Sequence, residues 1–328
     1  MGAMDSPDPF APLRSFRAAL YACFDRRADA LFEITDALLA SAPPASLPHL
    51  SLAPCHRRGW GSVYASLAEG RIAADTLRAA VASVPLAGGQ PVFAVDVSVW
   101  PRCDAEASPG RGFYYHPSRH SAGQPIVAGW AYQWVAQLGF ARESWTAPLD
   151  VRRVRPDENA TAVAADQIAD VVGHLPAEGP APLFVFDAGY DPVQLTQGLG
   201  AVPAAILVRL RSGRCFYADP PPREASPKGG RPRTHGAKFA CGDPGTWPAP
   251  SAEHAAEDDQ YGTVRVRAWA GLHPKQQEHT GRGSRRPRPV VRGTLVLVEV
   301  KRLPRQTRQP RALWLWWAGP GEPDLAPL

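Results

Sequence analysis

Two aspartates lie where a carboxylate is costly unless it has a partner. Asp96 interrupts the apolar run PVFAVDVSVW, and Asp187 ends the apolar run LFVFD. An ionised carboxylate beside a buried strand needs a compensating charge, which a divalent cation supplies. Two carboxylates on neighbouring strands can hold two Mg²⁺ ions about 3.5 to 4 Å apart, an arrangement that assists in-line displacement at a phosphodiester. For either aspartate alone, a turn or a helix cap is the competing interpretation.

The elements around both aspartates predict a mixed α/β sheet flanked by helices. Three strands are predicted first, over PVFAVDVSVW, residues 125–140 and residues 145–154. A helix capped by Asp157 then runs to about Leu175, and LFVFD follows as a central strand. Asp191 caps the next helix, with Pro192 at its first position, before the strand AAILVRLR. Because functional groups gather near the carboxyl ends of strands in such sheets, Asp187 is well placed for chemistry.

The remainder of the chain is organised around this core. Two helical patterns, from about Pro12 to Ala42 and from about Val63 to Val84, predict an N-terminal helical region, although helices that simply pack on the core fit equally well. The segment after Arg211 is rich in Pro, Gly and Arg, and strand patterns resume in GTLVLVEV and ALWLWWAG. We therefore predict a helical region over 1–88, a first part of the core over 89–211, a basic insertion over 212–288 and a return to core strands over 289–328.

The basic residues are concentrated in one half of the chain. The net charge is only +5, yet residues 209–317 hold 21 Lys and Arg against 9 Asp and Glu. A basic half on an otherwise acidic protein predicts a polyanionic partner. Codon bias toward arginine and a solvated basic loop are the alternatives. The candidate DNA contacts are Arg209, Arg211, Lys228, Arg231, Arg233, His235, Lys238, Arg285, Arg286 and Arg288.

Other site classes are not supported. The five cysteines are odd in number and show no C-x-x-C spacing, which argues against a disulfide framework or a zinc site and suits a reducing cytoplasm. The first residues form no secretory signal, and no apolar run reaches about 18 residues, so neither export nor membrane insertion is expected. SPKGGRPRTHG lacks the residue order of a P-loop, and Pro117 argues against a helical metal site at His116 and His120.

Three motifs together resemble bacterial insertion-sequence transposases of the DDE superfamily. They are FAVDVSVWPR, FVFDAGYDP and GRPRTHGAKFACGDPGTW, and the likeness runs from about Gly59 to Gly319. The resemblance implies an RNase H-like core in which Asp96 and Asp187 match the first two catalytic acids. It further implies DNA cleavage dependent on two Mg²⁺ (or Mn²⁺) ions, followed by attack of the freed 3′-hydroxyl on target DNA. The implied partner is double-stranded DNA, both element ends and target, bound by a homodimer in the cytoplasm at the nucleoid.

The chain departs from this family at the third acid. Members carry a Glu on a helix after the final strand, whereas here ALWLWWAGPGEPDLAPL leads into an acidic, Pro-rich segment. Glu299, Glu322 and Asp324 do not match the family position. We therefore expect a reading frame that is truncated or interrupted by a frameshift. A non-catalytic DNA-binding remnant or regulator, and an RNase H-like nuclease not involved in transposition, are the alternative functions.

Overall fold

The chain divides into a helical unit and a sheet unit. The computed structural model describes residues 8–84, 89–116, 123–139, 146–222, 234–275, 290–304 and 310–326. The helical unit comprises residues 1–86 with 174–177, and the sheet unit comprises residues 87–173 with 178–328. Among the described helices, none combines the length and apolar character needed to cross a bilayer.

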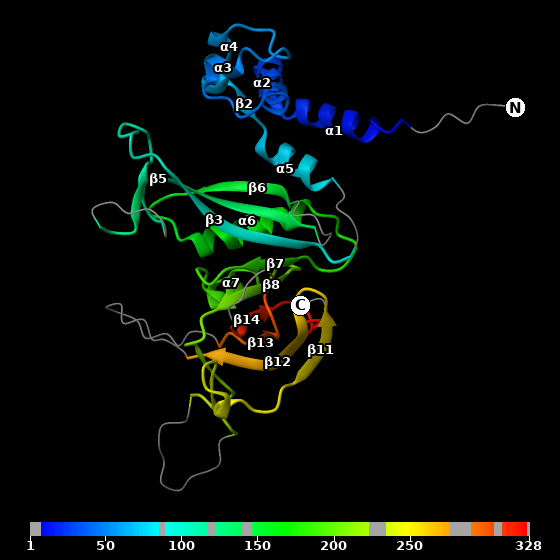
Figure 1. The fold of residues 1–328 in the computed structure, drawn as a ribbon, viewed down its shortest axis with the longest axis vertical. Coiled ribbons are helices and arrows are strands. Elements are labelled where there is room, and N and C mark those ends of the chain that lie inside the picture. The colour runs from blue at the N-terminus through cyan, green and yellow to red at the C-terminus, as the bar shows by residue number, and fades with distance from the viewer. Residues whose placement is uncertain are drawn as a thin grey trace, which may run out of the picture. The chain divides into compact units, whose positions relative to one another are not determined.

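The helical unit has a small apolar core shared by α2, α3 and α4, which lie together in Figure 1. Its elements are α1 (Ala11–Ala22), β1 (Phe24–Arg26), α2 (Ala28–Ala40), α3 (Leu47–Leu50), α4 (Trp60–Glu69), β2 (Arg71–Ile72) and α5 (Ala74–Ala82). The core residues are Ile34, Ala37, Leu50, Ala53 and Val63.

Both helices predicted for this region as continuous are broken, so those two predictions were wrong. Arg27 adopts a left-handed φ of 57°, which ends the regular backbone before α2. The short strands β1 and β2 then pair antiparallel, with Phe24 opposite Ile72. This pairing interrupts both helical segments at matching positions.

The sheet unit contains one mixed sheet of 12 strands. Its elements are β3 (Val92–Pro101), β4 (Gly112–Tyr115), β5 (Ile126–Leu138), β6 (Thr146–Val154), α6 (Ala160–His174), β7 (Leu183–Phe186), α7 (Pro192–Gly198), β8 (Ala205–Leu210), β9 (Cys215–Tyr217), β10 (Lys238–Ala240), the 3₁₀ turn η1 (Pro244–Thr246), β11 (Ala252–Asp258), β12 (Gly262–Pro274), β13 (Gly293–Val300) and β14 (Leu313–Ala318). The strand order is β10-β9-β12-β13-β14-β8-β7-β3-β5-β4, with β11 on β12 and β6 on β5.

Strands β3, β7 and β8 are mutually parallel, and antiparallel strands extend the sheet on both sides. This mixed sheet flanked by helices confirms the predicted RNase H-like fold class. Strands β9 to β12, within the Pro- and Gly-rich segment, hydrogen-bond into the same sheet through β13 and β14.

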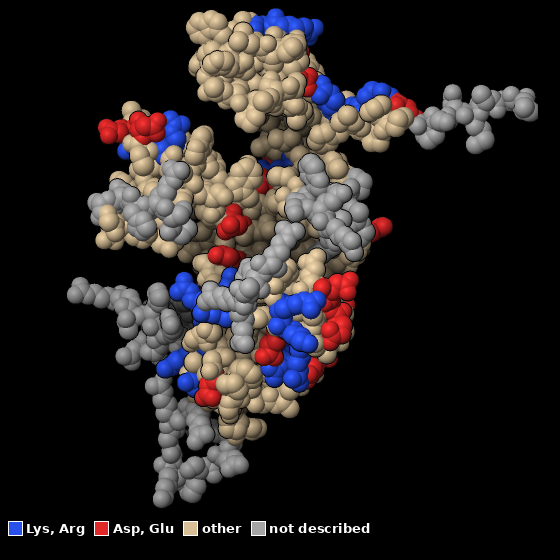
Figure 2. Space-filling view, in the orientation of Figure 1, with Lys and Arg blue, Asp and Glu red and all other residues tan. Residues whose placement is uncertain are grey.

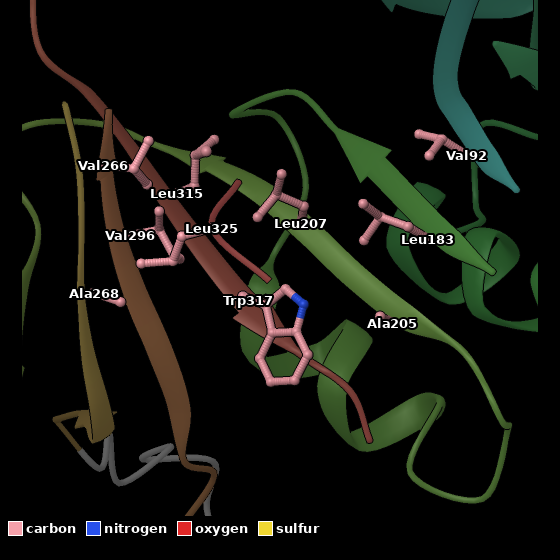
Figure 3. Packing of buried hydrophobic residues seen from close by; sticks show 10 residues of the cluster. All are labelled: Val92, Leu183, Ala205, Leu207, Val266, Ala268, Val296, Leu315, Trp317 and Leu325. Carbon is pink, nitrogen blue, oxygen red and sulfur yellow. The ribbon is translucent and has the colours of Figure 1, made fainter. Parts of the chain in front are cut away.

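The two faces of the sheet are packed differently. Helices α6 and α7 cover one face, where Gln133 of β5 hydrogen-bonds to Gln167 and Trp316 of β14 donates to Thr196. The opposite face carries an apolar cluster that spans six strands and includes Leu325 from the segment after β14 (Figure 3). Trp314, Trp316 and Trp317 are buried, as the packed-strand interpretation of ALWLWWAG predicts.

One predicted cap is corrected. The side chain of Asn159, not Asp157, accepts the first backbone N–H groups of α6, from Thr161 at 2.8 Å and Ala162 at 3.3 Å. Asn and Asp cap helices equally well, so the spacing of the apolar face did not distinguish two nearby candidates. Asp191 caps α7 as predicted, accepting from Val193 and Gln194.

Candidate active site

Asp96 and Asp187 lie next to each other in the strand register. Strands β3 and β7 pair parallel with Val95 opposite Phe186, and each aspartate is the next residue along its chain. Since neighbouring strands lie about 4.8 Å apart, the two residues are immediate neighbours where β7 ends. Both residues reach solvent, although Asp96 is partly buried. The register thus produces a pair of accessible carboxylates at the carboxyl end of a buried parallel strand.

The same row of the sheet contains an aromatic residue and an arginine. Trp134 of β5 is paired with Asp96. On the other side Val208 of β8 is paired with Phe186, so Arg209 is the neighbour of Asp187. Residues in one row of a sheet point to the same face. We call this face the carboxylate face. Asp96 lies on the same side of β3 as Val92, four residues earlier, and Val92 belongs to the apolar cluster on the face opposite α6 and α7.

Backbone N–H groups hold one oxygen of each carboxylate. Asp96 Oδ1 accepts from Val97 N–H at 2.8 Å, and Asp187 Oδ1 accepts from Gly189 N–H at 2.8 Å. A Cβ at position 189 would come within 2.9 Å of Asp187 Oδ1, so a larger residue there would force the Asp187 carboxylate to shift. Among the described residues, no Lys, Arg or His forms an ion pair with either aspartate.

The pKa of Asp96 is raised above its ordinary value. Partial burial is the main cause, the negative charge of Asp187 adds to it, and the hydrogen bond from Val97 N–H opposes it. The charge of Asp187 disfavours the ionised form of Asp96, and a cation bound between the two carboxylates offsets that cost. The electrostatics at this position therefore favour a positively charged ligand.

A buried polar network supports the turn after Asp187. Tyr190 is buried, and its hydroxyl contacts the side-chain amide of Gln133 at 3.2 Å. Gln133 in turn contacts Gln167 at 3.0 Å, and Gln167 Nε2 donates to Asp150 Oδ2 at 3.1 Å. Burial raises the pKa of Tyr190, and the charges of Asp96 and Asp187 raise it further, so its hydroxyl stays protonated. Satisfied networks of this kind hold backbone rigidly.

Sequence reasoning missed this network. The available signal was the presence of two glutamines, Gln133 and Gln167, at core positions of an otherwise apolar strand and helix face. Buried amides require hydrogen-bond partners, so they indicate a polar network.

The predicted DNA contacts fall in different places. Arg209 lies beside Asp187, and Arg211 follows β8 with an exposed side chain. Lys238 is exposed on β10, at the far edge of the sheet, and five strands separate it from β7. His235 is half-buried beside the rings of Tyr217 and His273. The other six candidates lie outside the described residues: Lys228, Arg231, Arg233, Arg285, Arg286 and Arg288.

His235 is poorly suited to hold a phosphate. Burial lowers its pKa, and the neighbouring His273 and Lys275 lower it further. The imidazole is therefore biased toward its neutral form, which attracts an anion weakly.

The three acids considered for a third position do not join the pair. Glu299 on β13 forms an ion pair with Arg267 at 2.7 Å. Glu322 and Asp324 line a cavity of about 770 Å³ on the carboxylate face, at the end where β3 begins, together with Val92 and Leu183. In the described part of the chain, no three His, Cys, Asp or Glu side chains gather closely enough to hold a metal ion.

A comparison with protein families identifies the superfamily. The family model described as DDE superfamily endonuclease matches residues 19–288, a range that contains both aspartates and every strand from β3 to β12. The chain belongs to the DDE superfamily of endonucleases. This confirms the superfamily that the three motifs indicated. DDE endonucleases act on DNA and generally use divalent metal ions. No curated protein matches the chain.

Proposed function

We propose that this DDE superfamily member is the transposase of a bacterial insertion sequence, with Asp96 and Asp187 as catalytic carboxylates. It would cleave a DNA strand at the element end and join the freed 3′-hydroxyl to target DNA, as a homodimer at the nucleoid. The observation that carries the proposal is the adjacency of two exposed carboxylates without an ion-pair partner among the described residues, at the carboxyl end of β7. Membership of the endonuclease superfamily indicates the reaction, because carboxylates that hold metal ions assist cleavage of phosphodiester bonds.

The donor set fits Mg²⁺ or Mn²⁺. Each aspartate has one oxygen held by a backbone N–H and a second oxygen that can turn toward a cation. Mg²⁺ commonly binds through one or two carboxylates and completes its shell with waters and substrate phosphates. Two such ions, when bound, offset the charge of the phosphodiester and promote ionisation of the attacking water.

The chain's own residues supply the positioning. Val97 and Gly189 N–H groups fix the orientation of the two carboxylates, and the Tyr190 network fixes the turn that carries Asp187. Arg209 sits beside Asp187 on the same face and carries a permanent positive charge. We assign it the role of contacting a phosphate of the bound strand, which orients the strand for attack at the neighbouring phosphate.

The test is divalent-metal-dependent nicking of supercoiled DNA that carries the element's terminal repeats. We expect Asp96→Asn and Asp187→Asn each to lower the nicking rate by at least about a hundredfold, because each removes a charge that holds the cation. Asp191→Asn is the matched control: Asp191 lies four residues from Asp187, and Asn preserves its capping of α7. Nicking that survives in both carboxylate variants would refute the assignment.

A second candidate function is a non-catalytic DNA-binding remnant or regulator. It is favoured by one observation, that no third potential metal ligand joins Asp96 and Asp187 among the described residues. This function predicts salt-sensitive DNA binding that is unchanged by Asp187→Asn, with no nicking by the unmodified chain. The same nicking assay therefore separates the two functions.

A further inference from the structure

Aromatic side chains continue the carboxylate face away from the aspartates along β3, β5 and β4. Trp134 is opposite Asp96, Tyr132 is opposite Ser98, and Trp130 is opposite Trp100. On the edge strand, Phe113 is paired with Ala128 and Tyr115 with Ile126. Strand alternation places all of these on the carboxylate face. The aromatic face, as we call it, consists of Trp100, Phe113, Tyr115, Trp130, Tyr132 and Trp134.

The aromatic face is exposed to an unusual degree. The exposed fractions are 74% for Phe113, 68% for Tyr115, 53% for Trp100 and 40% for Trp134. The alternate residues of β5 from Val127 to Val135, which lie on the other face, are buried. A strand with one buried face ordinarily presents polar residues on the other face. Several large exposed rings on one sheet face therefore indicate an interaction surface.

Arginines stack on these rings. The Arg102 guanidinium lies 5.8 Å from the ring centroid of Trp100, and that of Arg153 lies 5.6 Å from Trp130. Asp104 pairs with Arg102 at 3.1 Å, whereas Arg153 and Arg111 donate to backbone carbonyl oxygens and keep their charge. Arg102, Arg111 and Arg153 outnumber Asp104 and Glu106 by one at this end of the face. Rings combined with guanidinium groups suit both the bases and the phosphates of a nucleic acid.

We infer that the aromatic face binds unpaired nucleotides of the DNA strand next to the cleaved phosphate. The inference rests on the proposed function, since DNA that reaches Asp96 must lie on this face. Trp134 adjoins Asp96 directly, and Trp100 is four residues further along β3, about 13 Å. That distance equals the rise of about four stacked nucleotides. Base faces are available to aromatic side chains only where the duplex is opened, so the ligand is unpaired DNA.

A second copy of the chain is the competing occupant. The composition of the surface does not separate the two occupants, because aromatic residues and arginine are also enriched in protein–protein interfaces. The continuity of the aromatic face with the two aspartates, through the pairing of Trp134 with Asp96, is what favours the substrate strand over another protein.

The test compares two labelled DNA molecules of mixed sequence by fluorescence anisotropy, without divalent cations. One is a fully paired duplex, and the other is the same duplex with forked, unpaired ends. We expect Trp100→Ala and Phe113→Ala each to weaken binding of the forked DNA about tenfold, and of the paired duplex less than about twofold. Trp60→Ala is the matched control, because Trp60 is 65% exposed but lies on α4 of the helical unit.

Phe113→Ala guards against a folding artefact, since Phe113 is the most exposed ring of the aromatic face. Equal losses on forked and paired DNA, or no loss on either, would overturn the inference. So would unchanged DNA binding together with a lower oligomeric state in sedimentation, which would assign the surface to a second copy. Asp96→Asn should keep the preference for forked DNA, so a failure of the nicking assay and a failure of this inference remain distinguishable.

Discussion

At the scale of single residues, the central feature is the electrostatic cost of Asp96 beside Asp187. The folded chain holds both carboxylates next to each other and partly buries Asp96, which raises the pKa of Asp96. Because the ionised form of Asp96 is destabilised without a ligand, a bound cation stabilises this site more than it would stabilise an unperturbed carboxylate. Stability and metal binding should therefore be linked through this residue.

We predict that Asp96→Asn stabilises the metal-free protein near neutral pH. Because the pKa of Asp96 is higher in the folded state than in the unfolded state, ionisation favours unfolding. The free energy of unfolding thus falls as pH rises from the unfolded-state pKa through the folded-state pKa, and stays lower above it. The variant lacks this loss, so its melting temperature without divalent cations should exceed that of the unmodified chain at about pH 7 and match it below about pH 3.5.

Mg²⁺ supplies the second half of this test. Adding it should raise the melting temperature of the unmodified chain by ligand linkage and leave Asp96→Asn nearly unchanged. Asp166→Asn, on the exposed side of α6, is the control and should respond to Mg²⁺ like the unmodified chain. A lower melting temperature for Asp96→Asn at neutral pH without metal would contradict the electrostatic argument.

At the scale of elements, the sequence predicted the central strands well for a physical reason. Strand β7 and the first four residues of β8 are covered on both faces, so LFVF and AILV are continuous apolar runs, which are typical of central strands. The helical unit was predicted less well. Cys23 and Phe24 are buried like the apolar residues of α2, so the apolar spacing gives no sign of the break at Arg27.

We predict that two glycine-to-alanine substitutions in the sheet unit have opposite effects on stability. A Cβ at Gly129 of β5 would lie 2.1 Å from the carbonyl oxygen of Trp100, so Gly129→Ala must push β3 and β5 apart. We expect it to cost about 1–3 kcal/mol. Gly173 of α6 has nothing within 4 Å of an added Cβ, so Gly173→Ala should add up to about 0.5–1 kcal/mol through helix propensity.

Chemical denaturation with linear extrapolation measures both changes. The Gly129 variant should also weaken forked-DNA binding, because the affected strand pair carries Trp100 and Trp130. If Gly129→Ala proves as stable as the unmodified chain, the close approach of the two backbones would be wrong.

At the scale of the whole molecule, the count of basic residues overstates the free positive charge. In the described part of the basic half, Arg265 pairs with Glu253 and Arg267 with Glu299, and Arg292 pairs with Asp219. Figure 2 accordingly displays blue and red side chains intermixed over β11 and β12. A count of arginines from the sequence cannot distinguish free arginines from those in ion pairs, because the ion pairs form only once the strands are paired.

The same distinction explains which parts of the site were predictable. Asp96 lies within β3 and Asp187 directly follows β7, and the parallel pairing of these two strands brings the aspartates together. The two strands and their aspartates follow from local sequence patterns. Trp134 and Arg209 join the row only through the register of β5 and β8, which depends on pairing between distant segments. The register of β5 and β8 therefore cannot be predicted from local patterns in the sequence.

The phosphate contacts predicted in the SPKGGRPRTHG segment can be separated from a general charge effect by their salt dependence. The logarithm of the association constant for duplex DNA falls with the logarithm of salt concentration, with a slope of about −0.9 for each phosphate neutralised. If Lys228, Arg231 and Arg233 each contact a phosphate, replacing all three with Ala should make the slope less steep by about 2.7.

A matched variant removes the same charge from the helical unit. Replacing Arg14, Arg26 and Arg71 with Ala changes the net charge equally, so any difference in slope between the two triple variants reports local contacts rather than overall attraction. We expect the slope of this variant to stay close to that of the unmodified chain. Equal changes in both variants would indicate a diffuse charge effect, and a larger change in the second would move the duplex contacts to the helical unit.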